Sequence, residues 1–314
     1  MVNSVKITLK FKNACFSPFY IKDMVIIVKD SYSIDIKYTN SGVILKNAAN
    51  FSLSDTLDCG QAFRWYENEG KWYGIAHGKR ICLFNEGNDI IIDGTSKEDF
   101  DTIWRAYFDL DRDYGAVIEA VKVDKRLNKI CALTGGIRLL RQDPWEALCS
   151  FIISQNNNIP RIKGIVERLC QTFGENLGDG AYSFPSAERI AALTVEDLAP
   201  LRAGFRAKYI LDAAKKVADG SVPIYDLHKM DAQSAADCLM TISGVGPKVA
   251  ACALLFGCGH IECFPVDVWI KRAMEVMFSD GLPKYALPYA GIVQQYIFHY
   301  ARLTGLDADK MGEI

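Results

Sequence analysis

The sequence lacks several features that define other classes of protein. It has 4 histidines, none at metal-ligand spacing, and no Cys-x-x-Cys pair, so we predict no metal site and no cofactor. No apolar run approaches the roughly 20 residues that a membrane-spanning helix needs. Ten cysteines without regular spacing, and no recognisable secretory signal, favour a reducing compartment. We therefore expect a soluble, intracellular protein that binds no membrane.

The sequence also lacks the excess of basic residues that is typical of proteins that bind nucleic acids. Its 36 Lys and Arg residues face 38 Asp and Glu residues, giving a net charge of −2. One segment, 201–216, is locally basic, with five cations and a single acid, Asp212. Such a cluster is more commonly a solvated face than a binding site, so by itself it decides little.

Two kinds of periodicity divide the chain into a sheet-containing part and a helical part. Short β-branched or aromatic segments, separated by Gly, Asn and Asp, predict antiparallel strands at 25–28, 43–45, 62–66, 71–75, 80–84 and 89–92. A helix is then expected to open with a capping box at Thr95 to Glu98. Helical periodicity predicts further helices at 145–154, 160–173, 195–202, 207–218, 234–240, 248–255, 268–277 and 285–303.

We therefore predict an α+β fold, in which an N-terminal antiparallel sheet domain with helices, 25–134, precedes a mainly helical region, 135–314. Residues 1–24 form an extension of open status: an added strand, a tail or an upstream start are all compatible with the sequence.

Gly244 and Gly246 separate two predicted helices in a helix-hairpin-helix pattern at about 235–256. Glycine permits positive φ and leaves amide N–H groups exposed at a helix N-terminus, where a backbone phosphate can bind. A plain turn between helices explains the two glycines equally well. Lys248 favours the functional interpretation, because a cation in the first helical turn opposes the macrodipole by about 0.3–1 kcal/mol. Local conflicts of this kind tend to mark functional sites, although a lysine extended into water is the simpler alternative.

Asp267 lies nineteen residues after Lys248, directly before an amphipathic segment. An aspartate in this position is usually a helix N-cap. Capping does not exclude a second role, because the same carboxylate can face a positive charge that develops on a sugar.

Together these motifs resemble the helix-hairpin-helix DNA glycosylase superfamily, and within it the 8-oxoguanine DNA glycosylases. The resemblance extends over roughly residues 52–300. It implies a bifunctional enzyme in which Lys248 attacks C1′, forms a Schiff base and permits β-elimination, while Asp267 stabilises the oxocarbenium charge. Superfamily members without such a lysine use water, so Lys248 predicts the lyase step. The resemblance also rests on Cys59-Gly-Gln-Ala-Phe-Arg-Trp65, Ile137-Arg-Leu-Leu-Arg-Gln-Asp-Pro144 and Ser154-Gln-Asn-Asn-Asn-Ile159.

The resemblance further assigns residues that recognise the base. The Gly60 carbonyl would accept the N7–H that 8-oxoguanine has and guanine lacks, Gln294 would read the Watson–Crick edge, and Cys252 and Phe298 would enclose the flipped base. Without the family context, Gly60 is an ordinary turn glycine, and Cys252 and Phe298 are core residues. The implied partner is double-stranded DNA with 8-oxoguanine opposite cytosine, bound by a monomer.

Further DNA contacts are implied on both strands. A flipped base leaves a gap in the helix, and the resemblance assigns Asn156 to this gap. Arginine suits base acceptors because its donors form a planar fork. The remaining DNA-binding residues are Arg161 and Arg206 for the orphaned cytosine, Phe205 as a stacking wedge, and Gly244, Gly246 and Val249 at the hairpin.

Two departures from the family pattern point to altered contacts. Trp269 stands where the animal enzymes have a histidine, and Ala301 replaces the acid that partners it. No cysteine follows Cys263, so the iron–sulfur loop of the endonuclease III and adenine glycosylase branches is absent. Two alternative functions stay open: an alkylated-purine glycosylase that uses water, and a non-catalytic hairpin module that needs neither Lys248 nor Asp267.

Overall fold

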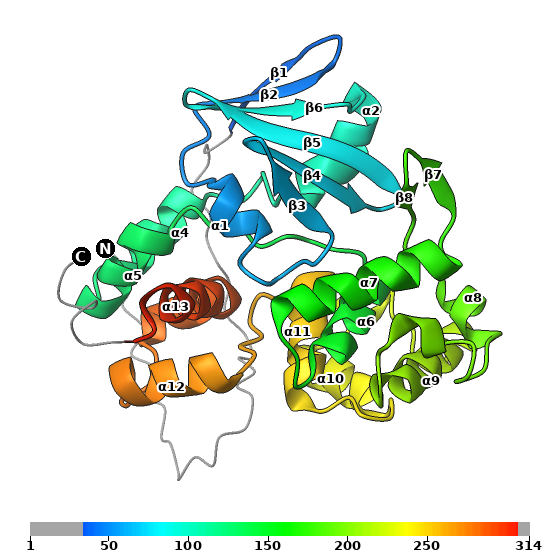
Figure 1. Ribbon diagram of the computed structural model, residues 1–314. Helices are drawn as coiled ribbons and strands as arrows, with labels where there is room; N and C mark the ends of the chain where they lie inside the picture. The colour runs from blue at the N-terminus through cyan, green and yellow to red at the C-terminus, as the bar shows by residue number, and fades with distance from the viewer. Residues whose placement is uncertain (1–33, 307–314) are drawn as a thin grey trace.

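The computed structural model describes residues 34–306. The strand predicted at 25–28 and the status of residues 1–24 lie outside the described residues. Figure 1 shows an antiparallel sheet on one side of the molecule and helices on the other, which confirms the predicted α+β fold. The sheet consists of β1 (Asp35–Tyr38), β2 (Gly42–Lys46), β3 (Trp65–Asn68), β4 (Lys71–Ala76), β5 (Lys79–Glu86) and β6 (Asp89–Asp93).

The sheet has the strand order β1-β2-β6-β5-β4-β3, and all neighbours are antiparallel. Alternate residues of the strands face inward because side chains in a strand alternate between the two faces. Val43 and Leu83 both pair with Ile92, and all three are at most 1% exposed. This face belongs to one hydrophobic cluster with Trp104 and Phe108, which lie beyond the strands in the sequence.

The first helix after the sheet begins one residue later than predicted. Ser96, rather than Thr95, is the N-cap, and its hydroxyl accepts a hydrogen bond from the Asp99 N–H at 3.0 Å. The helical backbone then continues through α2 (Lys97–Asp99), a π-helical segment (Phe100–Trp104) and α3 (Arg105–Tyr107).

Figure 1 shows most of the helices in two groups below the sheet. In one group α11 packs against α6 and α10, and in the other α13 packs against α5 and α12. The bounds are α1 (Leu53–Leu57), α4 (Tyr114–Val121), α5 (Lys125–Thr134), α6 (Pro144–Ser154), α7 (Ile159–Phe173), α8 (Ala187–Ala191), α9 (Arg206–Ala218), α10 (Ala232–Met240), α11 (Pro247–Gly257), α12 (Val268–Met277) and α13 (Ala290–Thr304). A short hairpin, β7 (Asn176–Gly178) and β8 (Ala181–Tyr182), follows α7.

Three other predicted elements differ in the structure, each for a local reason. Residues 62–64 do not form the start of a strand. The side chains of the adjacent Gln61 and of Arg64 instead contact Arg138 and Glu146 in the helical region. The helix predicted at 195–202 is reduced to a 3-10 turn (Ala199–Leu201) that ends at Arg202, whose φ of 53° is left-handed. The helix predicted at 285–303 begins with a 3-10 segment (Lys284–Tyr289), since Pro288 has no N–H to donate.

Two motifs of the sequence form one hydrogen-bonded unit that joins the sheet to the helices. The Gln61 side chain donates to the carbonyls of Thr56 at 2.9 Å and Arg138 at 2.8 Å, and it accepts from the Leu140 N–H at 2.9 Å. The Gln142 side chain donates to the Gln61 carbonyl at 2.6 Å. Because these groups are buried, loss of one partner would leave the others unsatisfied at a cost of about 1–3 kcal/mol each. The unit fixes the loop that carries Gly60.

The same loop is held by Arg64, which lies 3.5 Å from the Glu146 carboxylate and donates to the Tyr182 carbonyl. Burial raises the pKa of Glu146 to about 7, against the opposing effect of Arg64. The folded protein therefore keeps a proton on Glu146 at pH values where the unfolded chain has released it.

We expect the free energy of unfolding to decrease as pH rises from the ordinary carboxyl range to about 7, by up to about 1.4 kcal/mol per pH unit from this group. Glu146→Gln should flatten this part of the profile. Urea denaturation of both proteins at intervals between pH 5 and 8 measures the difference. Parallel profiles would show that Glu146 is ionised throughout this range.

Candidate active site

Six of the predicted residues line one cavity of about 390 Å³ between the two groups of helices. The walls come from the loop before β3, from α6, α7, α11 and α13, and from the segment before α12. The structure thus brings together residues that are more than two hundred positions apart in the sequence. They are Gly60, Lys248, Cys252, Asp267, Gln294 and Phe298.

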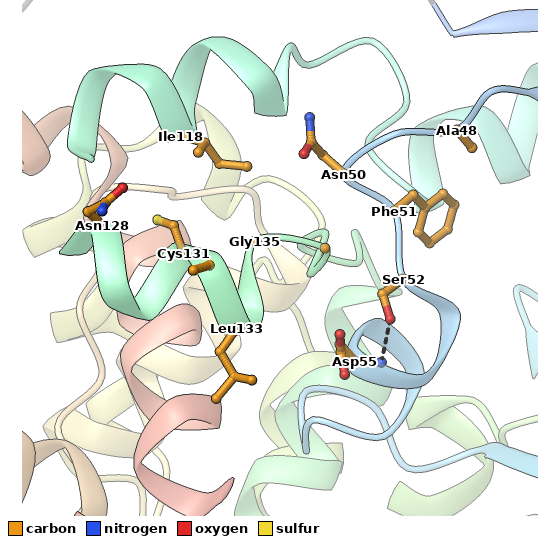
Figure 2. A pocket seen from close by; sticks show the side chains of 12 residues that line it. Ala48, Asn50, Phe51, Ser52, Asp55, Ile118, Asn128, Cys131, Leu133 and Gly135 are labelled. Atoms are coloured by element: carbon orange, nitrogen blue, oxygen red, sulfur yellow. Dashed lines mark hydrogen bonds between the residues drawn. The ribbon is translucent and has the colours of Figure 1, made fainter. Parts of the chain in front are cut away.

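A larger cavity, of about 490 Å³, lies elsewhere on the molecule and contains none of the predicted site residues. Figure 2 shows Asn50, Ser52 and Asp55 on one side of it and Cys131 and Leu133 of α5 on the other. Size alone therefore does not identify the functional site.

The hairpin between α10 and α11 is fixed by the locally basic segment on α9. Asp212 accepts a hydrogen bond from the Ser243 N–H at 2.7 Å, and Lys216 donates to the Thr241 carbonyl at 2.5 Å. Part of the cation cluster in the sequence therefore supports the hairpin structurally. Gly246 provides no capping side chain, and the Val249 side chain is 3% exposed, so any ligand here meets backbone N–H groups.

Gly244 is required in this turn by two features of the structure. Its φ is +76°, and a β-carbon placed on it would lie 2.4 Å from the Tyr209 ring. We expect Gly244→Ala to destabilise the protein by about 1–3 kcal/mol and to weaken binding to undamaged duplex DNA. Thermal denaturation and fluorescence anisotropy measure the two effects. Gly246→Ala is the matched control for stability, because a β-carbon there meets no protein atom within 4 Å. Equal stability of the two variants would show that the hairpin tolerates a side chain at Gly244.

Lys248 extends from the first turn of α11 into the cavity. Its Nζ lies 3.4 Å from the Ser154 hydroxyl and 5.7 Å from the centroid of the Phe151 ring. Asp267 caps α12, as predicted, and accepts the Ile270 N–H at 2.8 Å. The second carboxylate oxygen is left for other partners. An amine and a carboxylate thus share one cavity.

The Cys252 side chain, one turn after Lys248, is 4% exposed. Burial raises the pKa of its thiol, and Lys248 acts in the opposite direction. The Cys252 thiol is therefore neutral at physiological pH and forms a weakly polar part of the cavity wall.

Gly60 and Gln294 both line the cavity. Gly60 has φ +86°, and a β-carbon there would lie 3.1 Å from the end of Ile159. Gln295, from α13, donates to the Cys59 carbonyl at 3.3 Å and so steadies the turn. The Gln294 side chain is 5% exposed and donates to the Pro265 carbonyl at 3.1 Å. Within the described part of the chain its buried Oε1 has no hydrogen-bond partner.

Four residues predicted to contact DNA outside the base pocket lie in or beside the loop after α6 and do not line the cavity: Asn156, Arg161, Phe205 and Arg206. Asn156 is exposed and has a left-handed φ of 46°, which is strained for a residue with a side chain. Arg206 is only 2% exposed and donates to the carbonyls of Gln155 at 2.9 Å and Asn156 at 2.8 Å. Arg161 is exposed, and Phe205 is 49% exposed.

Several residues that shape the cavity were not predicted from the sequence. Ser154 and Phe151 contact the lysine, and Pro265 and Gln295 hold polar groups in place. Arg302 lines the cavity one helical turn after Phe298, so its i, i+4 spacing could have identified it. In the range 34–306 no group of acidic, histidine or cysteine side chains is arranged to hold a metal ion. No helix in that range has the length and apolar character needed to cross a membrane.

A lysine and an aspartate in one cavity, with the lysine directly after a glycine hairpin and an antiparallel sheet alongside, are the features of a helix-hairpin-helix DNA glycosylase. Residues 43–148 match the family model for the 8-oxoguanine DNA glycosylase N-terminal domain, and residues 149–283 match that for the HhH-GPD superfamily of base excision DNA repair proteins. The chain belongs to the 8-oxoguanine DNA glycosylase family, and it is a base-excision repair glycosylase with lyase activity.

Individual relatives agree with this assignment. The N-glycosylase/DNA lyase of Saccharomyces cerevisiae is 32% identical over 263 residues, which cover 74% of this chain and 69% of that protein. A solved structure of MBOgg1 in complex with a low-affinity DNA ligand is 42% identical with a TM-score of 0.81, covering 86% of this chain and 99% of that one. The Clostridium acetobutylicum 8-oxoguanine glycosylase/lyase, in complex with duplex DNA containing cytosine opposite 8-oxoguanine, is 36% identical with a TM-score of 0.81, covering 88% and 100%.

Proposed function

We propose that this protein, acting as a monomer, removes 8-oxoguanine opposite cytosine in duplex DNA and then cleaves the strand at the resulting site. The observation that carries the proposal is the position of Lys248, whose amine lies in one cavity with Asp267 and with the polar groups of Gly60 and Gln294. An amine in this place can act as a nucleophile on a sugar held in the same cavity.

The first step is displacement of the base at C1′. The Nζ lone pair of Lys248 forms a bond to C1′ while the bond from C1′ to N9 breaks, and the base leaves with the electron pair of that bond and takes up a proton. The positive charge that develops on the sugar is stabilised by the Asp267 carboxylate, because opposite charges attract strongly in a site with little water. The helix-capping bond keeps that carboxylate in position.

The second step converts the bound sugar into a strand break. The attached amine loses a proton, the sugar ring opens, and a Schiff base forms between Nζ and C1′. Removal of a proton from C2′ moves the C–H electron pair toward the imine and gives an enamine. The enamine electrons then form a double bond between C2′ and C3′, and the 3′ phosphate leaves with the electron pair of the C3′–O bond. Water finally hydrolyses the imine and restores Lys248.

The cavity also offers the contacts that 8-oxoguanine requires. The Gly60 carbonyl would accept the N7–H of the lesion, and the unpartnered Oε1 of Gln294 would accept the N–H groups of the Watson–Crick edge. Cys252 and Phe298 would enclose the ring between them. A buried acceptor that is satisfied only by the correct base gives strong discrimination, because other bases leave it unpaired.

The remaining contacts hold the DNA around the flipped nucleotide. We propose that backbone N–H groups at Gly244, Gly246 and Val249 bind phosphate, as helix N-termini commonly do. Asn156 would occupy the gap that the flipped base leaves, and Phe205 would stack beside that gap. The unpaired cytosine would be held by Arg161 and by Arg206, which must exchange its bonds to the loop carbonyls for the base.

The test is incubation of an 8-oxoguanine:cytosine duplex with the wild-type protein and borohydride, which reduces an imine to a stable bond. We expect base release, strand cleavage and a covalent protein–DNA complex. Base release without trapping would indicate water as the nucleophile and favour an alkylated-purine glycosylase. Binding without base release would favour a non-catalytic hairpin module.

A further inference from the structure

Arg302 is a cation at the cavity wall that the proposed reaction does not use. It lies on α13 eight residues after Gln294 and four after Phe298, so the three side chains share one face of the helix. Its Cζ lies 5.7 Å from the centroid of the Phe298 ring. Its Nη1 would lie 3.7 Å from a β-carbon placed on Gly60. The guanidinium therefore lies beside both the Phe298 ring and the turn that carries the Gly60 carbonyl.

The hydrogen-bond donors of Arg302 are available to a ligand. Among residues 34–306, no carboxylate forms an ion pair with Arg302 and no oxygen accepts a hydrogen bond from it. The side chain is exposed, so its charge is solvated in the free protein. A guanidinium has five N–H donors and no acceptor, so it can only serve a ligand atom that accepts.

The three residues of this helix face set the orientation of a base in the cavity, given the proposed function. Gln294 lies at the end of the cavity that would receive the Watson–Crick edge of the base. Eight residues of α-helix span about 12 Å, so Arg302 lies at the opposite end, beyond the ring of Phe298. Gly60, whose carbonyl would accept N7–H, lies at that same end. Next to N7 on the five-membered ring is C8, and in 8-oxoguanine C8 carries the carbonyl oxygen O8.

We propose that Arg302 donates a hydrogen bond to O8 of 8-oxoguanine and is a second residue that distinguishes the lesion from guanine. In guanine the same position is a C–H group, which offers a guanidinium no acceptor. Hydrogen bonds from a charged donor are roughly twice as strong as neutral ones. Gly60 would thus read the proton that the lesion gains, and Arg302 would read the oxygen.

The test compares single-turnover rates for the wild type and Arg302→Leu on three duplexes, each opposite cytosine. The first contains 8-oxoguanine. The second contains 8-thioxoguanine, which keeps N7–H but replaces O8 with sulfur, a weak acceptor. The third contains a preformed abasic site, where only strand cleavage is measured. We expect Arg302→Leu to slow release of 8-oxoguanine about tenfold or more, with less than a twofold change on the other two duplexes.

Two further variants make the result specific. Arg302→Lys should recover part of the rate on 8-oxoguanine, because it keeps a charged donor. Arg272→Leu removes an equally exposed cation from α12 outside the cavity and should leave the ratio of the three rates unchanged. Thermal denaturation establishes that each variant is folded.

Three outcomes would overturn the inference. If Arg302→Leu lowered the rate equally on all three duplexes, Arg302 would contact a phosphate of the DNA. If it lowered the rate equally on the two damaged bases alone, Arg302 would act by orienting the Phe298 ring. An unchanged rate on 8-oxoguanine would show that Arg302 makes no productive contact. Wild-type protein that releases no 8-oxoguanine would contradict the proposed function itself, before any variant is compared, and would remove the basis of this inference.

Discussion

Lys248→Gln is expected to abolish the trapped covalent complex and to lower base release by on the order of 10³-fold or more. Glutamine is polar and shorter, and its amide nitrogen has no free electron pair with which to attack C1′. The nearby Ser154 hydroxyl and the Phe151 ring remain in place, so the cavity keeps its shape. Denaturing gel electrophoresis after borohydride treatment measures the complex, and release of labelled base measures the first step.

A matched control for Lys248→Gln is Lys271→Gln, which removes an exposed lysine from α12 outside the cavity. This control should form the borohydride-trapped covalent complex as efficiently as the wild type. Covalent complex in the Lys248 variant would show that another amine forms the imine. Full base release without a complex would show that Lys248 is needed only for strand cleavage.

Asp267→Asn is expected to lower base release about 10²–10³-fold while leaving the folded state nearly as stable as in the wild type. Asparagine is as good an N-cap as aspartate, so the bond from the Ile270 N–H to the side chain is retained. The negative charge that we propose stabilises the sugar is lost. Single-turnover base release and thermal denaturation measure the two quantities.

Asp267→Ala separates the two roles further. It should lose both the charge and the cap, which adds a destabilisation of about 1 kcal/mol. If Asp267→Asn released the base as fast as the wild type while Asp267→Ala were destabilised, the residue would have only its capping role.

The general architecture followed from local patterns in the sequence. Strands with inward-facing Val43, Leu83 and Ile92 show the period of two that antiparallel sheets require when one face is buried. Asp267 was recognisable as a cap because it precedes an amphipathic segment. Predictions failed where distant contacts decide the backbone: residues 62–64 bend because Gln61 and Arg64 are bonded to the helical region. No local pattern carries that information.

The site was predictable where the chemistry lies in motifs and not where it depends on three-dimensional contacts. Lys248 was conspicuous because a cation in the first turn of a helix is electrostatically unfavourable. The near-complete burial of Arg206 on loop carbonyls depends on how α9 packs against the loop after α6, and no spacing indicates it. Arg302 was overlooked because an arginine near the end of an amphipathic helix is ordinary until its position beside Gly60 is known.

The hydrogen-bonded unit around Gln61 has a consequence for how this enzyme can change over evolutionary time. Gly60, which we propose reads the lesion, comes from the part of the chain that matches one family model, and the proposed nucleophile, Lys248, comes from the part that matches the other. The buried bonds between Gln61 and Arg138, Leu140 and Gln142 fasten the loop to the segment before α6, and the Gln142 N–H donates in turn to the Phe256 carbonyl of α11 at 2.8 Å. Substitutions in the loop can therefore alter which damaged base is accepted without touching the machinery that breaks the glycosidic bond, provided that this fastening is kept.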